Sequence, residues 1–267
     1  MKPAPFDYAA PRSVDDALSL LEREDSRALA GGQSLVPMLN FRLARPALVV
    51  DLNGLSELSY LRRVGDRALL IGALTRQVTL ERSELVQRDW PLLAQAVRMV
   101  GHPAIRSRGT VGGSVAHADP RAELPAALVA LDARFGVRSR RGERWFAAAE
   151  FFRMPFTTAI ADDELLTVVS VPPLPAGART AFVEQTRTHG DFALAGAAVV
   201  VAPGEHAAIT LVGAGGIPVR ATSAERALVA GAPADSVAEL AVEAVADDYR
   251  RALLAATVRV AIGGAMS

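Results

Sequence analysis

Two glycine pairs constrain this chain more than any other feature of its sequence. The first lies in residues 30–35, Ala-Gly-Gly-Gln-Ser-Leu, and the second in residues 110–114, Thr-Val-Gly-Gly-Ser. Each pair follows an apolar run, precedes a helix-like segment and has a hydroxyl residue beside it. Glycine lets a ligand approach the backbone closely, and amides at a helix N-terminus bind anions. We therefore expect both segments to expose backbone amides and to bind the diphosphate of one extended ligand from two sides.

A tight turn is the alternative interpretation of each glycine pair taken singly. A third glycine-rich segment, residues 212–218 (Val-Gly-Ala-Gly-Gly-Ile-Pro), resembles the start of a dinucleotide-binding fingerprint. Pro218 stands where the third glycine of that fingerprint belongs, and no ribose-binding carboxylate follows about 20 residues later in a strand. We interpret this third segment as a strand end and a turn.

The charge balance excludes several classes of partner. The 267 residues include 29 Lys and Arg and 29 Asp and Glu, which leaves a formal net charge of zero. Such a chain has no electrostatic footprint for nucleic acid or for an anionic membrane. No apolar run reaches the roughly 18 residues of a membrane-spanning helix, and the N-terminus lacks the apolar stretch of a secretory signal. We expect a cytoplasmic protein without an integral membrane segment.

The absence of cysteine limits the chemistry of the chain itself. It excludes disulfides and any cysteine-ligated iron–sulfur cluster or zinc site within this chain. The four histidines lack the spacing of metal ligands, so no metal site is expected. Neither a nucleophile elbow nor a P-loop lysine is present, and no residue is expected to be catalytic. For His117 and Asp119, just after the second glycine pair, hydrogen bonding within the loop is favoured over catalysis.

Three regions are expected along the chain, at residues 1–54, 55–173 and 178–267, because proline and glycine mark a boundary between the last two. In the first region Ser13 and Asp16 form a helix-capping pair. A small βαβ unit then follows, with its strand, helix and strand at residues 27–30, 34–40 and 47–52. This unit places the first glycine pair at the carboxyl end of a strand, where α/β folds bind ligands.

The other two regions combine strands with helices. In the middle region Pro91 and Gly101 mark the two ends of a helix. The elements expected there are strands near 68–73, 135–138, 144–146 and 164–169 and helices near 91–100 and 123–131. The elements expected in the last region are a strand near 180–185, a hairpin of 197–201 and 208–212 turning at Pro203-Gly204, a helix capped by residues 222–225, and a helix from 236 to 255 with room for an interruption.

Residues 30–37 and 108–116 together resemble the two flavin-binding signatures of the medium, FAD-binding subunit of the molybdenum hydroxylases. This family includes carbon monoxide dehydrogenase, xanthine dehydrogenase and bacterial N-heteroaromatic dehydrogenases. The resemblance extends over nearly the whole chain, through segments near residues 6–11, 163–172, 190–193 and 249–250. It implies an α+β fold, with a FAD-binding domain of two α/β subdomains of the vanillyl-alcohol-oxidase (PCMH) type and a C-terminal antiparallel sheet with helices.

The same resemblance implies which residues hold FAD. Glu123 matches an acidic residue that binds the ribose of the adenosine half, and Phe192 matches an aromatic residue, often tyrosine, close to the isoalloxazine. Leu165 and Leu166 match apolar residues that flank the flavin and the adenine, and Ser114 matches a position that is often asparagine. The complete expected set is Leu29, Ala30, Gly31, Gly32, Gln33, Ser34, Leu35, Thr110, Gly112, Gly113, Ser114, Glu123, Leu165, Leu166 and Phe192.

The function implied by the resemblance is electron relay. A large partner subunit would oxidise a substrate at a molybdenum cofactor, and a small partner subunit would carry the electrons through two 2Fe-2S clusters. This chain would receive them on FAD and pass them to an external acceptor, within a dimer of heterotrimers. A free-standing FAD-dependent oxidoreductase of the same fold is the alternative enzyme, and an interaction module that has lost FAD is the alternative outside enzymes. The substrate is not determined by this chain.

Overall fold

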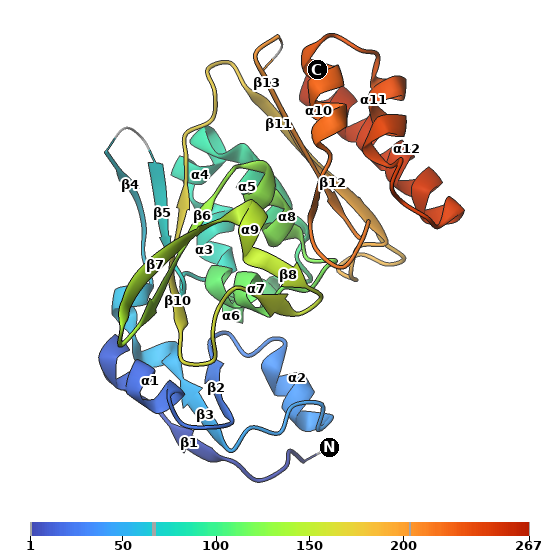
Figure 1. Cartoon of the computed structure of the whole chain (residues 1–267). Helices are drawn as coiled ribbons and strands as arrows, with labels where there is room; N and C mark the ends of the chain where they lie inside the picture. The colour runs from blue at the N-terminus through green and yellow to red at the C-terminus, as the bar shows by residue number, and fades with distance from the viewer. Residues whose placement is uncertain (1, 66–67, 203, 267) are drawn as a thin grey trace.

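Three larger β-sheets follow one another along the part of the chain that the structure describes, residues 2–65, 68–202 and 204–266. In this computed structural model they run from the N-terminal sheet, blue in Figure 1, through the middle sheet to the C-terminal sheet beside the red helices. The mixture of helices and sheets confirms the expected α+β fold. The division into regions 1–54, 55–173 and 178–267 stays a prediction, since Leu74 and Leu165 of the middle region lie in the N-terminal core.

The N-terminal sheet contains the expected parallel βαβ unit. Helix α1 (Val14–Leu21) begins after Ser13, whose hydroxyl accepts a hydrogen bond from the amide of Asp16, as predicted. Strand β3 (Leu48–Asp51) lies between β1 (Asp7–Ala9) and β2 (Ser26–Leu29) and is parallel to both. Helix α2 (Leu35–Asn40) connects β2 to β3. The first glycine pair therefore lies between the carboxyl end of β2 and the start of α2.

The middle sheet is antiparallel. Its strands, in spatial order, are β4 (Leu61–Val64), β5 (Ala68–Gly72), β10 (Leu165–Val171), β6 (Arg134–Ser139) and β7 (Gly142–Ala147). Its helices are α3 (Gln77–Arg82), α4 (Glu84–Asp89), α5 (Pro91–Met99), α6 (Pro103–Arg108), α7 (Val111–His117), α8 (Glu123–Ala130) and α9 (Ala148–Phe151). A hairpin of β8 (Phe152–Met154) and β9 (Thr157–Thr158) follows. Trp90, Phe135 and Phe151 lie in the shared core of these elements.

The C-terminal sheet is antiparallel and has an alanine- and valine-rich core. Its strands are β11 (Arg179–Gln185), β12 (Ala195–Ala202), β13 (His206–Val212) and β14 (Val219–Arg220), and its helices are α10 (Thr222–Val229), α11 (Ala234–Ala241) and α12 (Asp248–Met266). The expected hairpin is formed by β12 and β13, although Pro203 of its turn lies outside the described residues. Among the described residues, no helix has the length and apolar character needed to cross a membrane.

Two expectations for the C-terminal helices are corrected. Residues 222–225 do not cap α10, because Thr222 is its first residue and the Ala221 before it makes no side-chain cap. The Glu225 carboxylate instead accepts hydrogen bonds from the Ile209 amide (2.8 Å) and the Arg220 guanidinium, and so ties α10 to β13 and β14. The interruption that the sequence allowed in the helix expected from 236 to 255 lies at residues 242–247, but the bounds are corrected, since α11 begins at Ala234 and α12 extends to Met266.

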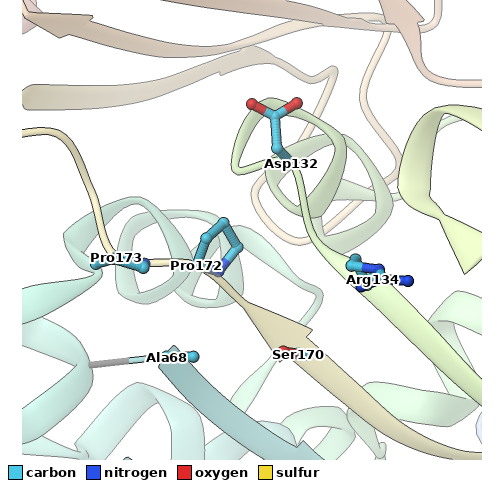
Figure 2. A pocket seen from close by; sticks show the side chains of 6 residues that line it. All are labelled: Ala68, Asp132, Arg134, Ser170, Pro172 and Pro173. Carbon is cyan, nitrogen blue, oxygen red and sulfur yellow. The ribbon is translucent and has the colours of Figure 1, made fainter. Parts of the chain in front are cut away.

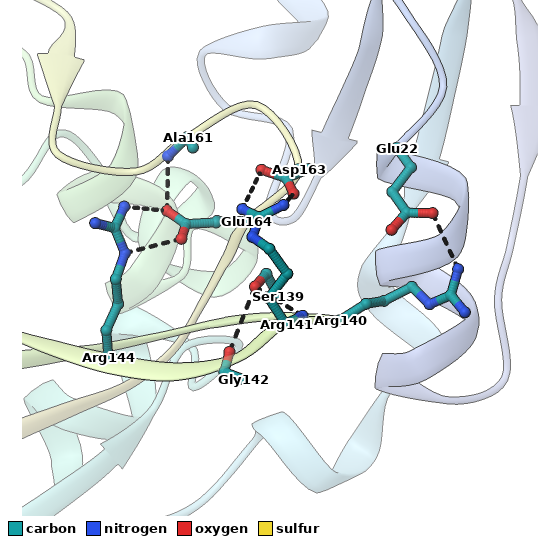
Figure 3. A network of polar contacts seen from close by, with 9 residues as sticks. All are labelled: Glu22, Ser139, Arg140, Arg141, Gly142, Arg144, Ala161, Asp163 and Glu164. Carbon is teal, nitrogen blue, oxygen red and sulfur yellow. Dashed lines mark hydrogen bonds and ion pairs between the residues drawn. The ribbon is translucent and has the colours of Figure 1, made fainter.

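Ion pairs attach the β6–β7 hairpin to its neighbours (Figure 3). Arg140 donates to Glu22 of α1 (3.1 Å), and Arg144 binds both carboxylate oxygens of Glu164, at 2.8 and 2.6 Å. Arg141, in the turn of the hairpin, pairs with Asp163, the residue before Glu164. Glu164 also accepts the amide of Ala161 (2.8 Å), so its carboxylate closes the turn before β10. The Arg140–Glu22 pair joins the middle sheet to α1 of the N-terminal region, and the other contacts fix the hairpin to the turn before β10.

Candidate functional site

The first glycine pair forms an open run of backbone donors. Within residues 2–65, 68–202 and 204–266, no acceptor receives a hydrogen bond from the amides of residues 31–35. Gly32 has a φ of +74°, which glycine adopts without strain, and α2 begins at Leu35. Consecutive amides around such a residue form an anion-binding concavity, and the helix N-terminus adds a favourable dipole. The amides of the first signature therefore have no acceptor among the described residues, although Gly31 itself is buried.

The second glycine pair is arranged differently, which corrects the expectation that its amides are free. Thr110 caps α7, and its hydroxyl accepts the Gly113 amide at 3.0 Å. The Gly112 amide donates to the Ala73 carbonyl (2.8 Å), and the Val111 amide donates to the Thr75 carbonyl (2.9 Å). These amides are engaged because the start of α7 packs closely on the residues after β5, where a Cβ on Gly112 would lie 2.5 Å from the Cβ of Ala73. This pair joins α7 to the end of β5.

The fold brings the two signatures into contact. A Cβ on Gly31 would lie 2.4 Å from the Arg108 carbonyl oxygen and 2.8 Å from the Gly109 Cα. A Cβ on Gly113 would lie 3.7 Å from the Cβ of Ala30. Segments that are far apart in the sequence are thus in contact, and their binding of one ligand stays a prediction. Gly31 is required for this contact, because any side chain there would push the segments apart.

A polar network that the sequence did not indicate lies beside both signatures. The Asn53 side chain donates to the carbonyl of Ala30 (2.8 Å) and accepts from Arg76 (2.7 Å). Arg76 also donates to the carbonyl of Arg108, two residues before Thr110. These residues follow strand ends, and their only sequence signal is a polar side chain at such a position. Their convergence on the two signatures depends on the tertiary structure.

Glu123 is buried, as expected of a residue with a specific polar role. It is the first residue of α8 and is 5% exposed. Burial, with smaller contributions from the carboxylates of Glu184 and Asp119, raises the pKa of Glu123 to about 8. Burial also raises the pKa of Glu184, on β11, to about 7, and its Oε2 has no hydrogen-bond partner among the described residues. A ligand hydroxyl would satisfy such a carboxyl group.

The other expected FAD-binding residues have separate surroundings. Phe192 is 47% exposed on the segment between β11 and β12, and the Arg121 guanidinium lies 5.0 Å from its ring centroid. Leu165 and Leu166 are buried in two different hydrophobic cores, because adjacent strand residues point to opposite faces. Leu165 lies in the N-terminal core, against which Ala30 of the first signature packs, and Leu166 lies in the core of the middle sheet. The roles of these two leucines beside the cofactor stay predictions.

The residues at and just after the end of α7 have structural partners. The Asp119 carboxylate accepts the Arg121 amide (2.9 Å), as the interpretation of loop hydrogen bonding predicted. His117 lies against Phe156, with ring centroids 5.2 Å apart, and burial lowers the pKa of His117. Among the described residues, no group of three or more acidic or histidine side chains could hold a metal ion.

An open pocket of about 260 Å³ lies elsewhere, lined by Ala68, Asp132, Arg134, Ser170, Pro172 and Pro173 (Figure 2). It is formed where β5 and β6 begin and β10 ends. The second signature contacts the other end of β5, at Ala73. The pocket is therefore separate from the two signatures.

Comparison with known proteins identifies the class to which this site belongs. Residues 4–174 match the family described as the FAD binding domain in molybdopterin dehydrogenase, and the chain belongs to this family. The resemblance inferred from the two signatures is thereby confirmed, and the chain is a flavoprotein component of a molybdenum-dependent oxidoreductase.

Individual relatives agree along most of the chain. The 6-hydroxypseudooxynicotine dehydrogenase complex subunit alpha of Paenarthrobacter nicotinovorans is 44% identical over 236 residues, covering 86% of this chain and 79% of that protein. The carbon monoxide dehydrogenase medium chain of Hydrogenophaga pseudoflava is 38% identical over 203 residues, covering 75% of this chain and 70% of that protein.

Solved structures agree with the fold over its full length. A chain of carbon monoxide dehydrogenase from Hydrogenophaga pseudoflava matches with a TM-score of 0.94 at 35% identity, covering 100% of this chain and 99% of that chain. A chain of quinoline 2-oxidoreductase from Pseudomonas putida 86 matches with a TM-score of 0.92 at 33% identity, covering 99% and 98%. None of these relatives supports the alternative of a free-standing flavin oxidoreductase.

Proposed function

We propose that the amides of residues 31–35 bind the diphosphate of FAD, with the second signature closing the site from the other side. This proposal rests on the backbone amides of residues 31–35, which have no acceptor among the described residues. A doubly charged diphosphate supplies several acceptors at this spacing, and the N-terminus of α2 favours its negative charge. Because the amides of residues 111–113 are engaged, the second signature acts through the Ser114 hydroxyl and the close approach that Gly113 allows.

Glu123 is the proposed partner of the ribose hydroxyls of the adenosine half. Its carboxyl is buried, and Glu184 contributes a second carboxyl beside it. Ribose hydroxyls donate to a carboxylate and also accept from a protonated carboxyl group, so the contact is satisfied in either state. In the same proposal Phe192 lies near the isoalloxazine, and Leu165 and Leu166 flank the flavin and the adenine.

The subunit is proposed to relay electrons between partners. FAD supplies the capacity to accept and release electrons, and this chain binds the cofactor, orients it and shields it from water. The electrons come from 2Fe-2S clusters of a small subunit, which receive them from a molybdenum cofactor on a large subunit. The chain has no cysteine with which to bind a cluster itself. A dimer of heterotrimers in the cytoplasm is the assembly that we propose.

Two matched glycine variants test the binding site. Gly32 and Gly177 both have a positive φ, of +74° and +69°, so leucine imposes similar backbone strain at either position. Only Gly32 belongs to the open amide run. We expect the full chain with Gly32→Leu to lose FAD, measured by flavin absorbance after gel filtration, while Gly177→Leu retains it. Equal FAD content in both variants would contradict the assignment of the diphosphate to residues 31–35.

A further inference from the structure

Arg76 connects the two signature segments through a chain of side-chain hydrogen bonds. It is the residue before α3, and its backbone pairs with Thr110 of the second signature. One terminal nitrogen of its guanidinium donates to Asn53 Oδ1 at 2.7 Å, and the other donates to the carbonyl of Arg108. The Asn53 amide in turn donates to the carbonyl of Ala30 at 2.8 Å. The path from Ala30 to Arg108 therefore passes through Asn53 and Arg76.

Asp51 and Tyr8 hold the Asn53 end of this series of hydrogen bonds in place. Asp51 Oδ1 accepts the Asn53 backbone amide at 2.9 Å, and Asp51 Oδ2 accepts the Tyr8 hydroxyl at 2.6 Å. Although burial opposes it, the hydrogen bonds from Tyr8 and Asn53 hold the pKa of Asp51 below its ordinary value. Asp51 is thus a carboxylate that orients Asn53. The side chain of Asn53 can then present one acceptor to Arg76 and one donor to Ala30 at the same time.

The geometry favours a bridging role for Arg76 over a simple electrostatic one. Burial and the charge of Arg108 lower the pKa of Arg76, while the carboxylate of Asp51 opposes them, so a like charge acts on this guanidinium. Repulsion between like charges disfavours that arrangement unless hydrogen bonds compensate it. A planar guanidinium can span two acceptors in fixed directions, whereas an ammonium group cannot reproduce that geometry. The two terminal nitrogens of Arg76 are both engaged with the segments that flank the site.

We infer that Arg76 is a positioning residue, which with Asn53 holds the two signature segments at the spacing required by the FAD diphosphate. This inference rests on the proposed function. A diphosphate binds tightly only if its donors are already in place, because ordering them during binding reduces the affinity. These two side chains, which we call the Arg76–Asn53 clamp, bind the carbonyls of Arg108 and Ala30. The neighbouring amides of residues 31–35 therefore stay directed at the ligand.

The test measures FAD binding by fluorescence titration of the full chain without cofactor. We expect Arg76→Lys, which keeps the charge, and Asn53→Ala each to raise the Kd for FAD about ten-fold, the loss typical of one hydrogen bond to a charged group. The Kd of the double variant for FAD is expected to be no higher than that of the weaker-binding single variant, because Arg76 and Asn53 act through the same series of hydrogen bonds. Arg62→Lys is the matched control, since Arg62 is exposed and packs on Tyr60 at 4.9 Å.

A second readout separates positioning from a general loss of structure. Hydrogen exchange of the FAD-free chain is expected to accelerate in Arg76→Lys at the hydrogen-bonded amides beside Arg76 and Arg108, those of Gln77, Gly109 and Val111, while the core strand β12 exchanges as in the wild type. Unchanged FAD affinity in Arg76→Lys together with weak binding in Arg76→Gln would mean that charge alone matters, and would overturn the clamp. Additive losses in the double variant would also overturn it. Failure of the wild-type chain itself to bind FAD would instead contradict the proposed function.

Discussion

Replacing Glu123 by glutamine removes a buried ionisable group while nearly keeping its size. Burial, with repulsion from Glu184 and Asp119, raises the pKa of Glu123 from 4.5 to about 8 in the folded chain. Between these pH values the folded chain holds a proton that the unfolded chain has released. The free energy of unfolding of the wild type therefore falls as the pH rises from 4.5 to about 8, and Glu123 adds no further slope outside this window.

The size of the effect follows from the pKa shift. At about 1.36 kcal/mol per pKa unit, the shift corresponds to roughly 5 kcal/mol as an upper bound. Glutamine does not ionise and so avoids this cost. We expect FAD-free Glu123→Gln to be more stable than the wild type by about 2–5 kcal/mol above pH 8 and to differ by less than about 1 kcal/mol near pH 4.5. Such a gain is a large fraction of the total stability of a typical domain.

Urea unfolding at pH 4.5, 7 and 8.5, followed by tryptophan fluorescence, measures this difference. The exposed Glu205, with Glu205→Gln, provides the control for removal of a surface carboxylate. Stability curves of wild type and Glu123→Gln that stay parallel across the pH range would refute the reasoning, because they would mean that Glu123 titrates alike in both states. Glutamine still offers an acceptor and a donor to the ribose hydroxyls, so the loss of FAD affinity is expected of Glu123→Ala, which removes the contact and should bind FAD about ten-fold less tightly.

Other predictions follow from single contacts. Gly112→Ala places a Cβ 2.5 Å from the Cβ of Ala73, so we expect a loss of about 1–3 kcal/mol in urea unfolding. Phe192→Ala removes an exposed ring that contacts Arg121 and should change stability by less than about 1 kcal/mol; a shifted absorbance spectrum of bound flavin would confirm its proximity to the isoalloxazine. The full chain loaded with FAD but lacking partner subunits should show no flavin bleaching by organic substrates under anaerobic conditions, and bleaching would favour a free-standing oxidoreductase.

Local sequence was sufficient to predict most of the elements. Ser13 and Asp16 form their capping pair because the contact spans a single helical turn. The same holds for α5, which begins at Pro91 and ends before Gly101, whose φ is +47°. The capping pattern at residues 222–225 was misleading, since the Glu225 carboxylate accepts the amide of Ile209, 16 residues earlier in the chain, in competition with the local cap. A pattern read within one turn is reliable only where no distant group competes for the same atoms.

The sequence by itself determined which two segments meet in the folded chain. Two glycine pairs with hydroxyl neighbours predicted two segments that approach one diphosphate, and the fold places them in contact through Gly31. It also determined that this chain cannot bind an iron–sulfur cluster through cysteine, because it has none.

Only the tertiary structure decided how the site is built. The amides of the second signature are engaged because α7 packs against the end of β5, and no local pattern records that contact. Arg76 lies 23 residues from Asn53 and 32 from Arg108, and Asn53 lies 23 from Ala30, so their contacts exist only once the sheets have formed. The raised pKa of Glu123 likewise requires burial beside a carboxyl of another sheet. Side-chain types are local properties of a sequence, whereas the environments that give them function are made by long-range packing.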